Sequence, residues 1–150
     1  MQPQAIREAI ADAARNGVTL PDGIGKLTAT GYVPDAVVTP HFFCGEYSVD
    51  FDKAMRRSLD EMELTCRVLV SRADDRSAQV ILDGLLAGHG PASLKESIEA
   101  ARGAPGEYAL GGLAHDFHVT RIQGYRWYEH QGTQYVGAEL IIKILGEGDA

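Results

Sequence analysis

Two segments of this chain alternate apolar and polar residues, and they constrain the fold more than any other feature of the sequence. Their apolar positions are Met62, Leu64, Cys66, Val68 and Val70 in the first and Val136, Ala138, Leu140, Ile142 and Ile144 in the second. A period of two sends successive side chains to opposite faces of an extended chain. The alternation therefore predicts two long strands in a sheet with one buried face.

Shorter alternating runs predict that each long strand belongs to a hairpin. Residues 47–51 precede the first long strand, and residues 52–61, which contain no Gly or Pro, are expected to form a long hairpin connection. Residues 117–127 precede the second long strand, with Gly124 expected as a bulge and residues 130–133 as a turn. The chain is therefore expected to end in an antiparallel hairpin.

Helices are predicted where apolar residues recur at intervals of three and four. Such spacing occurs in residues 3–16, 71–87 and 93–101. Ser93 and Glu96 have the spacing of a capping box at the start of the third segment. The order helix, hairpin, two helices, hairpin is typical of the α+β class. We expect a single domain, residues 1–150, with a largely antiparallel sheet packed by an N-terminal helix and a central helix pair.

The charge balance disfavours a protein that grips nucleic acid. The 150 residues include 14 Lys and Arg against 21 Asp and Glu, for a formal net charge of −7. Binding to DNA phosphates requires a cationic face. No stretch of about eighteen apolar residues predicts a membrane span, and the N-terminus lacks the pattern of a signal peptide. The two cysteines are too few for a disulfide framework, so we expect a protein made and folded in a cytoplasm.

Residues with metal-binding or catalytic chemistry are present but poorly spaced. His115 and His118 lie at the start of a predicted strand, where positions three apart point to opposite faces. His41, Cys44 and Cys66 could hold zinc only if the fold brought them together, and Cys66 is on the apolar side of its strand. The sequence contains neither a nucleophile elbow nor a phosphate-binding loop. We therefore predict no catalytic residue, no cofactor and no metal ligand.

Pairs of adjacent aromatic residues point instead to contacts with other chains. Phe42 and Phe43 are neighbours in the sequence, as are Trp127 and Tyr128. On extended backbone the members of each pair face opposite sides, so one member of each is expected outside the core of the monomer. Aromatic residues are enriched at protein interfaces. The alternative is that the sheet is covered on both sides.

The chain resembles a known family, the tail terminator or tail-completion proteins of long-tailed (siphovirus-type) bacteriophages, particularly those of actinobacteria. The resemblance covers about residues 45–145. Its most telling parts are the segment LVSRADDRSAQ (69–79) followed by Leu82-Asp83, and the segment YVGAE (135–139). These motifs are structural and not catalytic. Residues 1–44 match only in length and in having an amphipathic helix.

The resemblance implies a structural virion protein and not an enzyme. Members of the family form a ring, usually of six copies, at the head-proximal end of the tail tube. The ring ends tube polymerisation and joins the tail to the stopper, or head-completion, protein of the neck, and genomic DNA crosses its lumen at ejection. The implied partners are therefore the chain itself, the tail tube protein and the neck protein, with no membrane. The implied location is the virion, after assembly in the host cytoplasm.

A ring with head-to-tail contacts needs two different complementary patches on each copy. The long connection at 52–61 and the loop expected at 39–45 are candidates for reaching a neighbouring subunit or the tube. The predicted interface residues are Phe42, Phe43, Arg56, Arg57, Asp60, Glu61 and Trp127. Two other classes remain open: another neck protein of stopper or head-closure type, and a small non-viral interaction or metal-binding domain.

Overall fold

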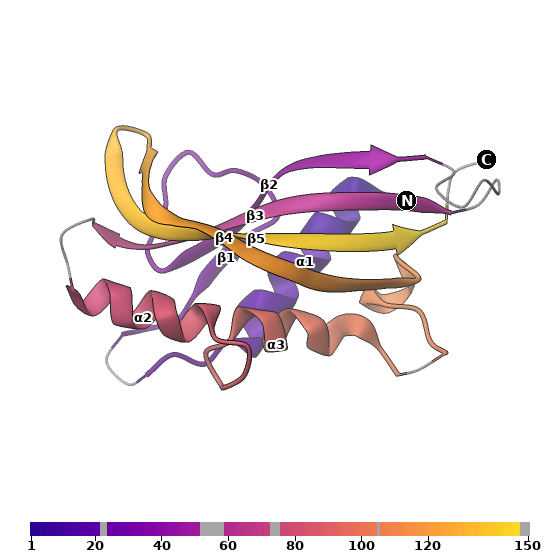
Figure 1. Cartoon of the computed structure of the whole chain (residues 1–150), viewed down its shortest axis with the longest axis horizontal. Coiled ribbons are helices and arrows are strands. Elements are labelled where there is room, and N and C mark those ends of the chain that lie inside the picture. Colours follow the sequence, from indigo (N-terminus) through magenta and orange to yellow (C-terminus); the bar gives the residue numbers. More distant parts are fainter. Residues whose placement is uncertain (22–23, 52–58, 73–75, 105, 148–150) are drawn as a thin grey trace.

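The computed structural model of the chain describes residues 1–21, 24–51, 59–72, 76–104 and 106–147. In these residues five strands form one sheet in the order β1-β2-β3-β5-β4 (Figure 1). The strands are β1 (Thr28–Thr30), β2 (His41–Asp50), β3 (Asp60–Arg72), β4 (Asp116–His130) and β5 (Thr133–Gly146). The short β1 pairs parallel with β2, and every other neighbouring pair is antiparallel. The predicted α+β fold with a largely antiparallel sheet is confirmed.

The C-terminal hairpin has the turn and the bulge that the sequence predicts. His130 pairs with Thr133 across a two-residue turn in which Gln131 and Gly132 have φ of 51° and 81°. Positive φ at both central residues suits the right-handed twist of paired strands. Gly124, with φ of 66°, lies where the register of β4 against β5 shifts. The bulge bends β4 at this point.

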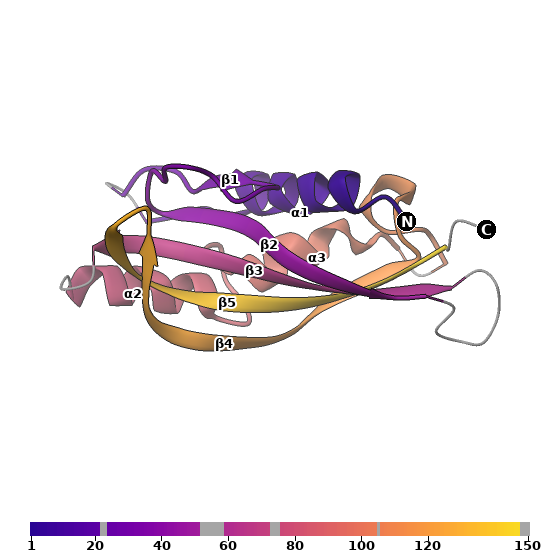
Figure 2. The ribbon, with the colours of Figure 1, turned by 90° about the horizontal axis from the view of Figure 1, so that it is seen from above.

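Three α-helices in the described residues cover one face of the sheet. They are α1 (Pro3–Gly17), α2 (Arg76–Leu86) and α3 (Leu94–Glu99), and two short 3-10 helices follow, η1 (Ala100–Arg102) and η2 (Leu110–Gly112). Apolar side chains from all three α-helices join one buried cluster with the inward positions of β2 to β5, which include Cys66 and Leu140. In Figure 1 α2 and α3 follow each other along the lower side of the sheet and α1 crosses behind the strands; Figure 2 shows β4 on the side away from α1.

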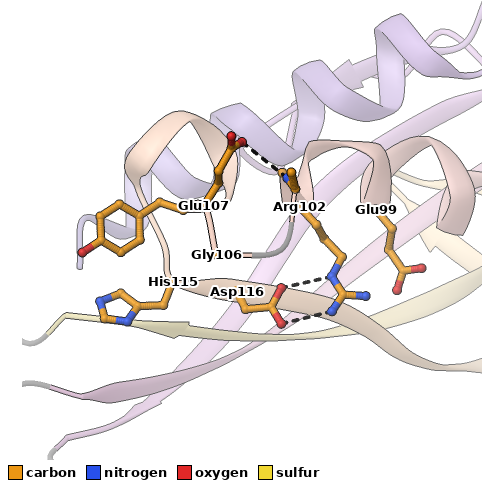
Figure 3. Close-up of a pocket in the computed structure, with 9 residues that line it drawn as sticks. Glu99, Arg102, Gly106, Glu107, His115 and Asp116 are labelled. Carbon is orange, nitrogen blue, oxygen red and sulfur yellow. Dashed lines mark hydrogen bonds and ion pairs between the residues drawn. The ribbon is translucent and has the colours of Figure 1, made fainter.

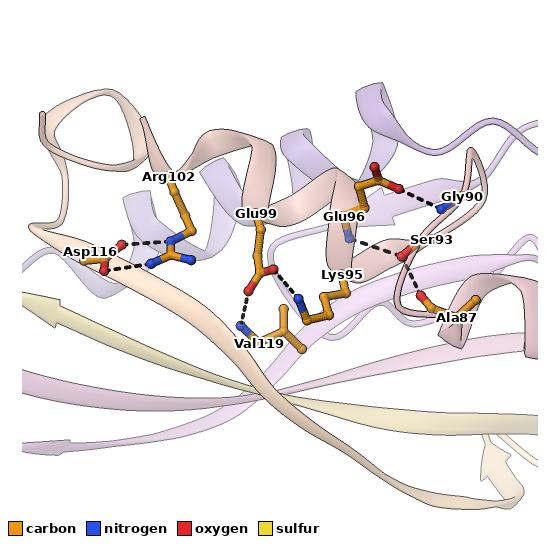
Figure 4. Close-up of polar contacts among 9 residues, drawn as sticks. All are labelled: Ala87, Gly90, Ser93, Lys95, Glu96, Glu99, Arg102, Asp116 and Val119. Carbon is orange, nitrogen blue, oxygen red and sulfur yellow. Dashed lines mark hydrogen bonds and ion pairs between the residues drawn. The ribbon is translucent and has the colours of Figure 1, made fainter. Parts of the chain in front are cut away.

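The predicted cap at Ser93 is confirmed at the start of α3, but Glu96 has a different partner from the one that a capping box predicts. The Ser93 hydroxyl oxygen accepts a hydrogen bond from the backbone N–H of Glu96 at 3.1 Å, and the hydroxyl donates to the Ala87 carbonyl at 2.5 Å. The Glu96 carboxylate accepts from the backbone N–H of Gly90 at 2.7 Å instead of from Ser93 (Figure 4). The contacts of Ser93 and Glu96 thus connect the end of α2, the intervening loop and the start of α3.

The second face of the sheet is covered at one end by the segment between β1 and β2. Phe43, Leu69 and Tyr128 form a small buried cluster on this face, with Val37 packed against it. The His130 ring nitrogen Nε2 lies 2.7 Å from the Pro34 carbonyl oxygen of the same segment. The loop expected at residues 39–45 is wrong from His41 onward, because β2 begins there and pairs with both β1 and β3.

Within the described ranges, no helix is both long enough and apolar enough to span a membrane.

Candidate interaction surface

The two phenylalanines predicted at an interface are inside the molecule. Phe42 is 0% exposed in the main core, and Phe43 is 3% exposed in the cluster on the opposite face. The expectation that one of them lies outside the monomer core is wrong. The alternative, a sheet covered on both sides, holds at this end of β2 because the segment after β1 covers Phe43. Neither side chain is available to a partner.

The charged residues predicted in the first hairpin connection divide between β3 and the undescribed part of the chain. Asp60 and Glu61 are the first residues of β3, where Asp60 is buried and pairs with Gly146. The Glu61 carboxylate lies 3.5 Å from the Lys143 ammonium group of β5. Because β3 begins at Asp60, two residues before Met62, the connection between β2 and β3 is shorter than the predicted 52–61. Arg56 and Arg57 lie outside the described residues.

Trp127 is exposed, as the sequence predicts, and it has apolar neighbours that sequence reasoning missed. Its side chain is 57% exposed on the outer half of β4, while the adjacent Tyr128 is buried. Ile122 and Tyr125 are also exposed large hydrophobic residues on β4. Ile122 pairs with Leu140 and Trp127 with Val136, two core positions of β5, so both side chains are on the helix side of the sheet. We call Ile122, Tyr125 and Trp127 the edge patch.

Tyr125 owes its place in the edge patch to the bulge at Gly124, which shifts the register of the strand. Its hydroxyl is near the Asp83 carboxylate of α2, and partial burial together with this negative charge raises the pKa of Tyr125. The alternation in the sequence breaks at Gly124. The sequence predicts that Tyr125 and Trp127 resume the alternation after Gly124, but only Trp127 is among the predicted interface residues.

The other face of the same stretch of β4 is cationic. Arg121, Gln123 and Arg126 are exposed on it, opposite Ile141, Glu139 and Gly137 of β5. The Arg121 guanidinium donates to the Gln123 side-chain oxygen at 2.9 Å. The Arg126 guanidinium carbon lies 4.8 Å from the centre of the Tyr128 ring. Beyond Thr120, β4 therefore presents arginines on one face and apolar groups on the other.

The first part of β4 has its outer edge covered by α3 and η1. The Glu99 carboxylate accepts from the backbone N–H of Val119 at 3.2 Å and from the Lys95 ammonium group at 2.6 Å. Arg102 makes two hydrogen bonds of 3.0 Å to the Asp116 carboxylate (Figure 4). These bonds hold the pKa of Asp116 below its usual range. The covered part thus ends near Val119, and the outer half of the strand begins there.

A hollow of about 690 Å³ lies between the end of α3 and the start of β4 (Figure 3). Its carboxylates already have partners: Glu99 and Asp116 as above, while Glu107 accepts from the backbone N–H of Ala104 at 3.4 Å. The centres of the Tyr108 and His115 rings are 5.1 Å apart, and both residues line the hollow. The acidic groups of the hollow serve to join the helix, loop and strand.

The residues that the sequence offers as candidate zinc ligands, His41, Cys44 and Cys66, do not come together. Cys44 and Cys66 are buried in the main core with their sulfurs 3.6 Å apart, while His41 is on the opposite face of β2 and packs against Phe43. Burial first, and then the contact with Cys44, raises the pKa of the Cys66 thiol. In the part of the chain that the structure describes, no group of three or more His, Cys, Asp or Glu could hold a metal ion.

No protein-family model matches this chain, and no curated protein matches it at a significant level of sequence similarity.

Proposed function

We propose that this chain is a structural protein of a phage tail, a tail terminator that forms a ring at the head-proximal end of the tail tube. The observation that carries the proposal is the outer half of β4, a sheet edge that holds the exposed edge patch. An uncovered edge strand with large apolar side chains is a template for association with another chain. The resemblance of residues 45–145 to tail terminators supplies the kind of assembly.

The two edges of the sheet differ, as head-to-tail assembly requires. One edge is β4, and the other is the short β1 followed by the rest of β2. A contact between two different surfaces on each copy generates a ring when the rotation closes. Six copies of the 16.2 kDa chain would have a mass of about 97 kDa. The proposed partners beyond the ring are the tail tube protein and the neck protein.

The net charge of −7 is consistent with a channel that DNA crosses without binding. Like charges keep phosphates from associating with a wall, whereas a cationic wall would retain them. The proposed ring therefore needs no catalytic group and no cofactor for its task. Its task is to end a polymer, present a surface to the neck, and leave the lumen open.

The test is tube capping. Purified protein is added to tail tube protein that is polymerising, and tube lengths and tube ends are measured by electron microscopy. A terminator shortens the tubes and is seen at one end only. If the protein leaves tube length unchanged and instead binds the capsid-side adaptor, the chain is a stopper or head-closure protein and the proposal is overturned.

A further inference from the structure

We propose that copies of this chain join edge to edge, with the outer half of β4 in one copy pairing with residues 45–50 of β2 in the next. This inference rests on the proposed function only in expecting self-association. It names the two surfaces that meet and the chemistry that matches them. Both surfaces consist of residues that the structure describes.

Residues 45–49 of β2 are at an edge of the sheet that the described residues form. In the described residues β1 pairs with His41, Phe42 and Phe43, and the later residues of β2 pair with β3. Within the described chain, no strand lies against the other side. Glu46, Tyr47 and Ser48 are exposed. A strand edge of this kind accepts a further strand through its backbone N–H and C=O groups.

The side chains on this β2 edge complement those on β4. Ser48 is on the face of the sheet away from the helices, because it pairs with the outward Glu63 of β3. Glu46 is on the same face, where it lines a hollow together with Phe43, Arg67 and Glu139. Tyr47 pairs with the core residue Leu64 and is on the helix side, where the Arg7 guanidinium packs on its ring at 5.6 Å. The β2 edge is therefore acidic and polar on one face and apolar on the other.

The β4 edge has the opposite charge on the same face. Arg121 and Arg126 are on the face away from the helices, and the edge patch is on the helix side. When two strands pair, side chains opposite one another share a face. Pairing the two edges in a continuous sheet places the arginines of β4 beside the acidic side chains of β2 on one face. On the other face it places the edge patch beside the apolar side chains of β2. Flipping one copy would bury charges against the edge patch, so the match also selects one orientation.

Strand direction is consistent with this arrangement. β2 is antiparallel to β3, β3 to β5, and β5 to β4, so β2 and β4 run in opposite directions in one copy. A second copy placed alongside in the same orientation therefore pairs its β2 antiparallel to β4. The register that sets Arg121 opposite Asp50 sets Gln123 opposite Ser48 and brings Arg126 toward Glu46. Every contact is head to tail, and a ring can close.

Charge reversal tests the polar half of the match. We expect Glu46→Arg and Arg126→Glu each to weaken self-association at least tenfold, measured by sedimentation over a concentration series. Combining the two substitutions restores association, because the pair is regenerated with its signs exchanged. Glu107→Lys is the matched control: it changes the charge by the same amount on the hollow, away from both edges, and leaves association unchanged. Circular dichroism on each variant shows that the monomer is folded.

Disulfide trapping tests the register. In the variant Ser48→Cys/Gln123→Cys, mild oxidation of the folded protein should give a ladder of linked copies that collapses under reducing conditions. Each single variant, and the mismatched variant Ser48→Cys/Glu129→Cys, should give none. The two native cysteines are buried and serve as an internal background in every sample.

The failures of the two proposals are distinguishable. A ring of normal mass that gives no Ser48–Gln123 ladder and tolerates charge reversal overturns the edge pairing and leaves tube capping intact. A chain that neither associates nor cross-links at millimolar concentration also overturns the edge pairing, and tube capping alone then decides the function. Linked copies without tube capping support the edge pairing and count against the tail role.

Discussion

His41 is a buried histidine at the junction of β1 and β2. Its Nδ1 lies 2.6 Å from the Thr28 hydroxyl oxygen and its Nε2 lies 3.2 Å from the Thr30 hydroxyl oxygen. Burial, with a smaller contribution from the nearby His130, lowers the pKa of His41 from 6.5 to about 4. The neutral imidazole therefore belongs to the folded state.

The lowered pKa makes stability depend on pH. Between pH 6.5 and 4 the unfolded chain binds a proton at His41 that the folded chain does not, so stability falls as the pH drops through this window. The loss at His41 is on the order of 3 kcal/mol. We expect urea unfolding of His41→Gln to depend less on pH than that of the wild type in the same window. Equal pH dependence in the two proteins would show that His41 does not titrate this way.

Ser93 is the second residue with a decisive role, because its hydroxyl both caps α3 and holds the end of α2. Ser93→Ala removes both hydrogen bonds from a fully buried position. We expect a loss of about 1–2 kcal/mol in the free energy of unfolding, measured in urea. A variant as stable as the wild type would mean that water or a rearranged loop replaces the hydroxyl.

At the scale of elements, the contact between β3 and β5 joins the two hairpins into one sheet. Gly137 of β5 lies opposite Leu69, and a Cβ at Gly137 would overlap the Val68 carbonyl oxygen. The overlap is with backbone, which cannot rotate away. This position is therefore closed to any side chain.

We expect Gly137→Ala to lower the free energy of unfolding by about 1–3 kcal/mol, because the central strands must separate locally. Gly88→Ala is the matched control, since a Cβ there has no heavy atom within 4 Å. Thermal and urea unfolding of both variants measure the difference. Comparable stability of the two variants would contradict the close approach of the strands.

At the scale of the whole molecule, a substitution at Trp127 distinguishes the folding of the monomer from its assembly. Its indole is more than half exposed and outside both buried clusters. Trp127→Ala should therefore change the stability of the monomer by no more than about 0.5 kcal/mol. Under the proposed function it should also reduce self-association strongly, because aromatic side chains commonly contribute most of the binding energy at interfaces. Native mass and urea unfolding on one preparation separate the two effects.

If Trp127→Ala lowers the free energy of unfolding by as much as it weakens the free energy of self-association, then Trp127 belongs to the core and this assignment is wrong. Tyr128→Ala is the contrasting variant. Tyr128 is buried, and its hydroxyl donates to the Gly124 carbonyl oxygen at 2.5 Å. We expect it to lower stability first, through lost packing and a lost hydrogen bond.

Local patterns in the sequence determined the elements of this protein. Alternation predicted β3, β4, β5 and the second half of β2, spacings of three and four predicted the helices, and Gly124 and Ser93 marked the bulge and the cap. These signals work because they depend on backbone geometry and on neighbours a few residues away. They also predicted the α+β class, the two hairpins and an exposed aromatic residue in the pair Trp127 and Tyr128.

Only the tertiary structure decided which outward positions stay exposed. Phe43 and Trp127 have the same local pattern, yet the segment after β1 covers Phe43 and no described element buries Trp127. The order of the strands, which makes β4 an edge and gathers the edge patch there, depends on the β3–β5 contact between distant parts of the chain. Burial is a property of what packs on a residue, and no local pattern carries that information.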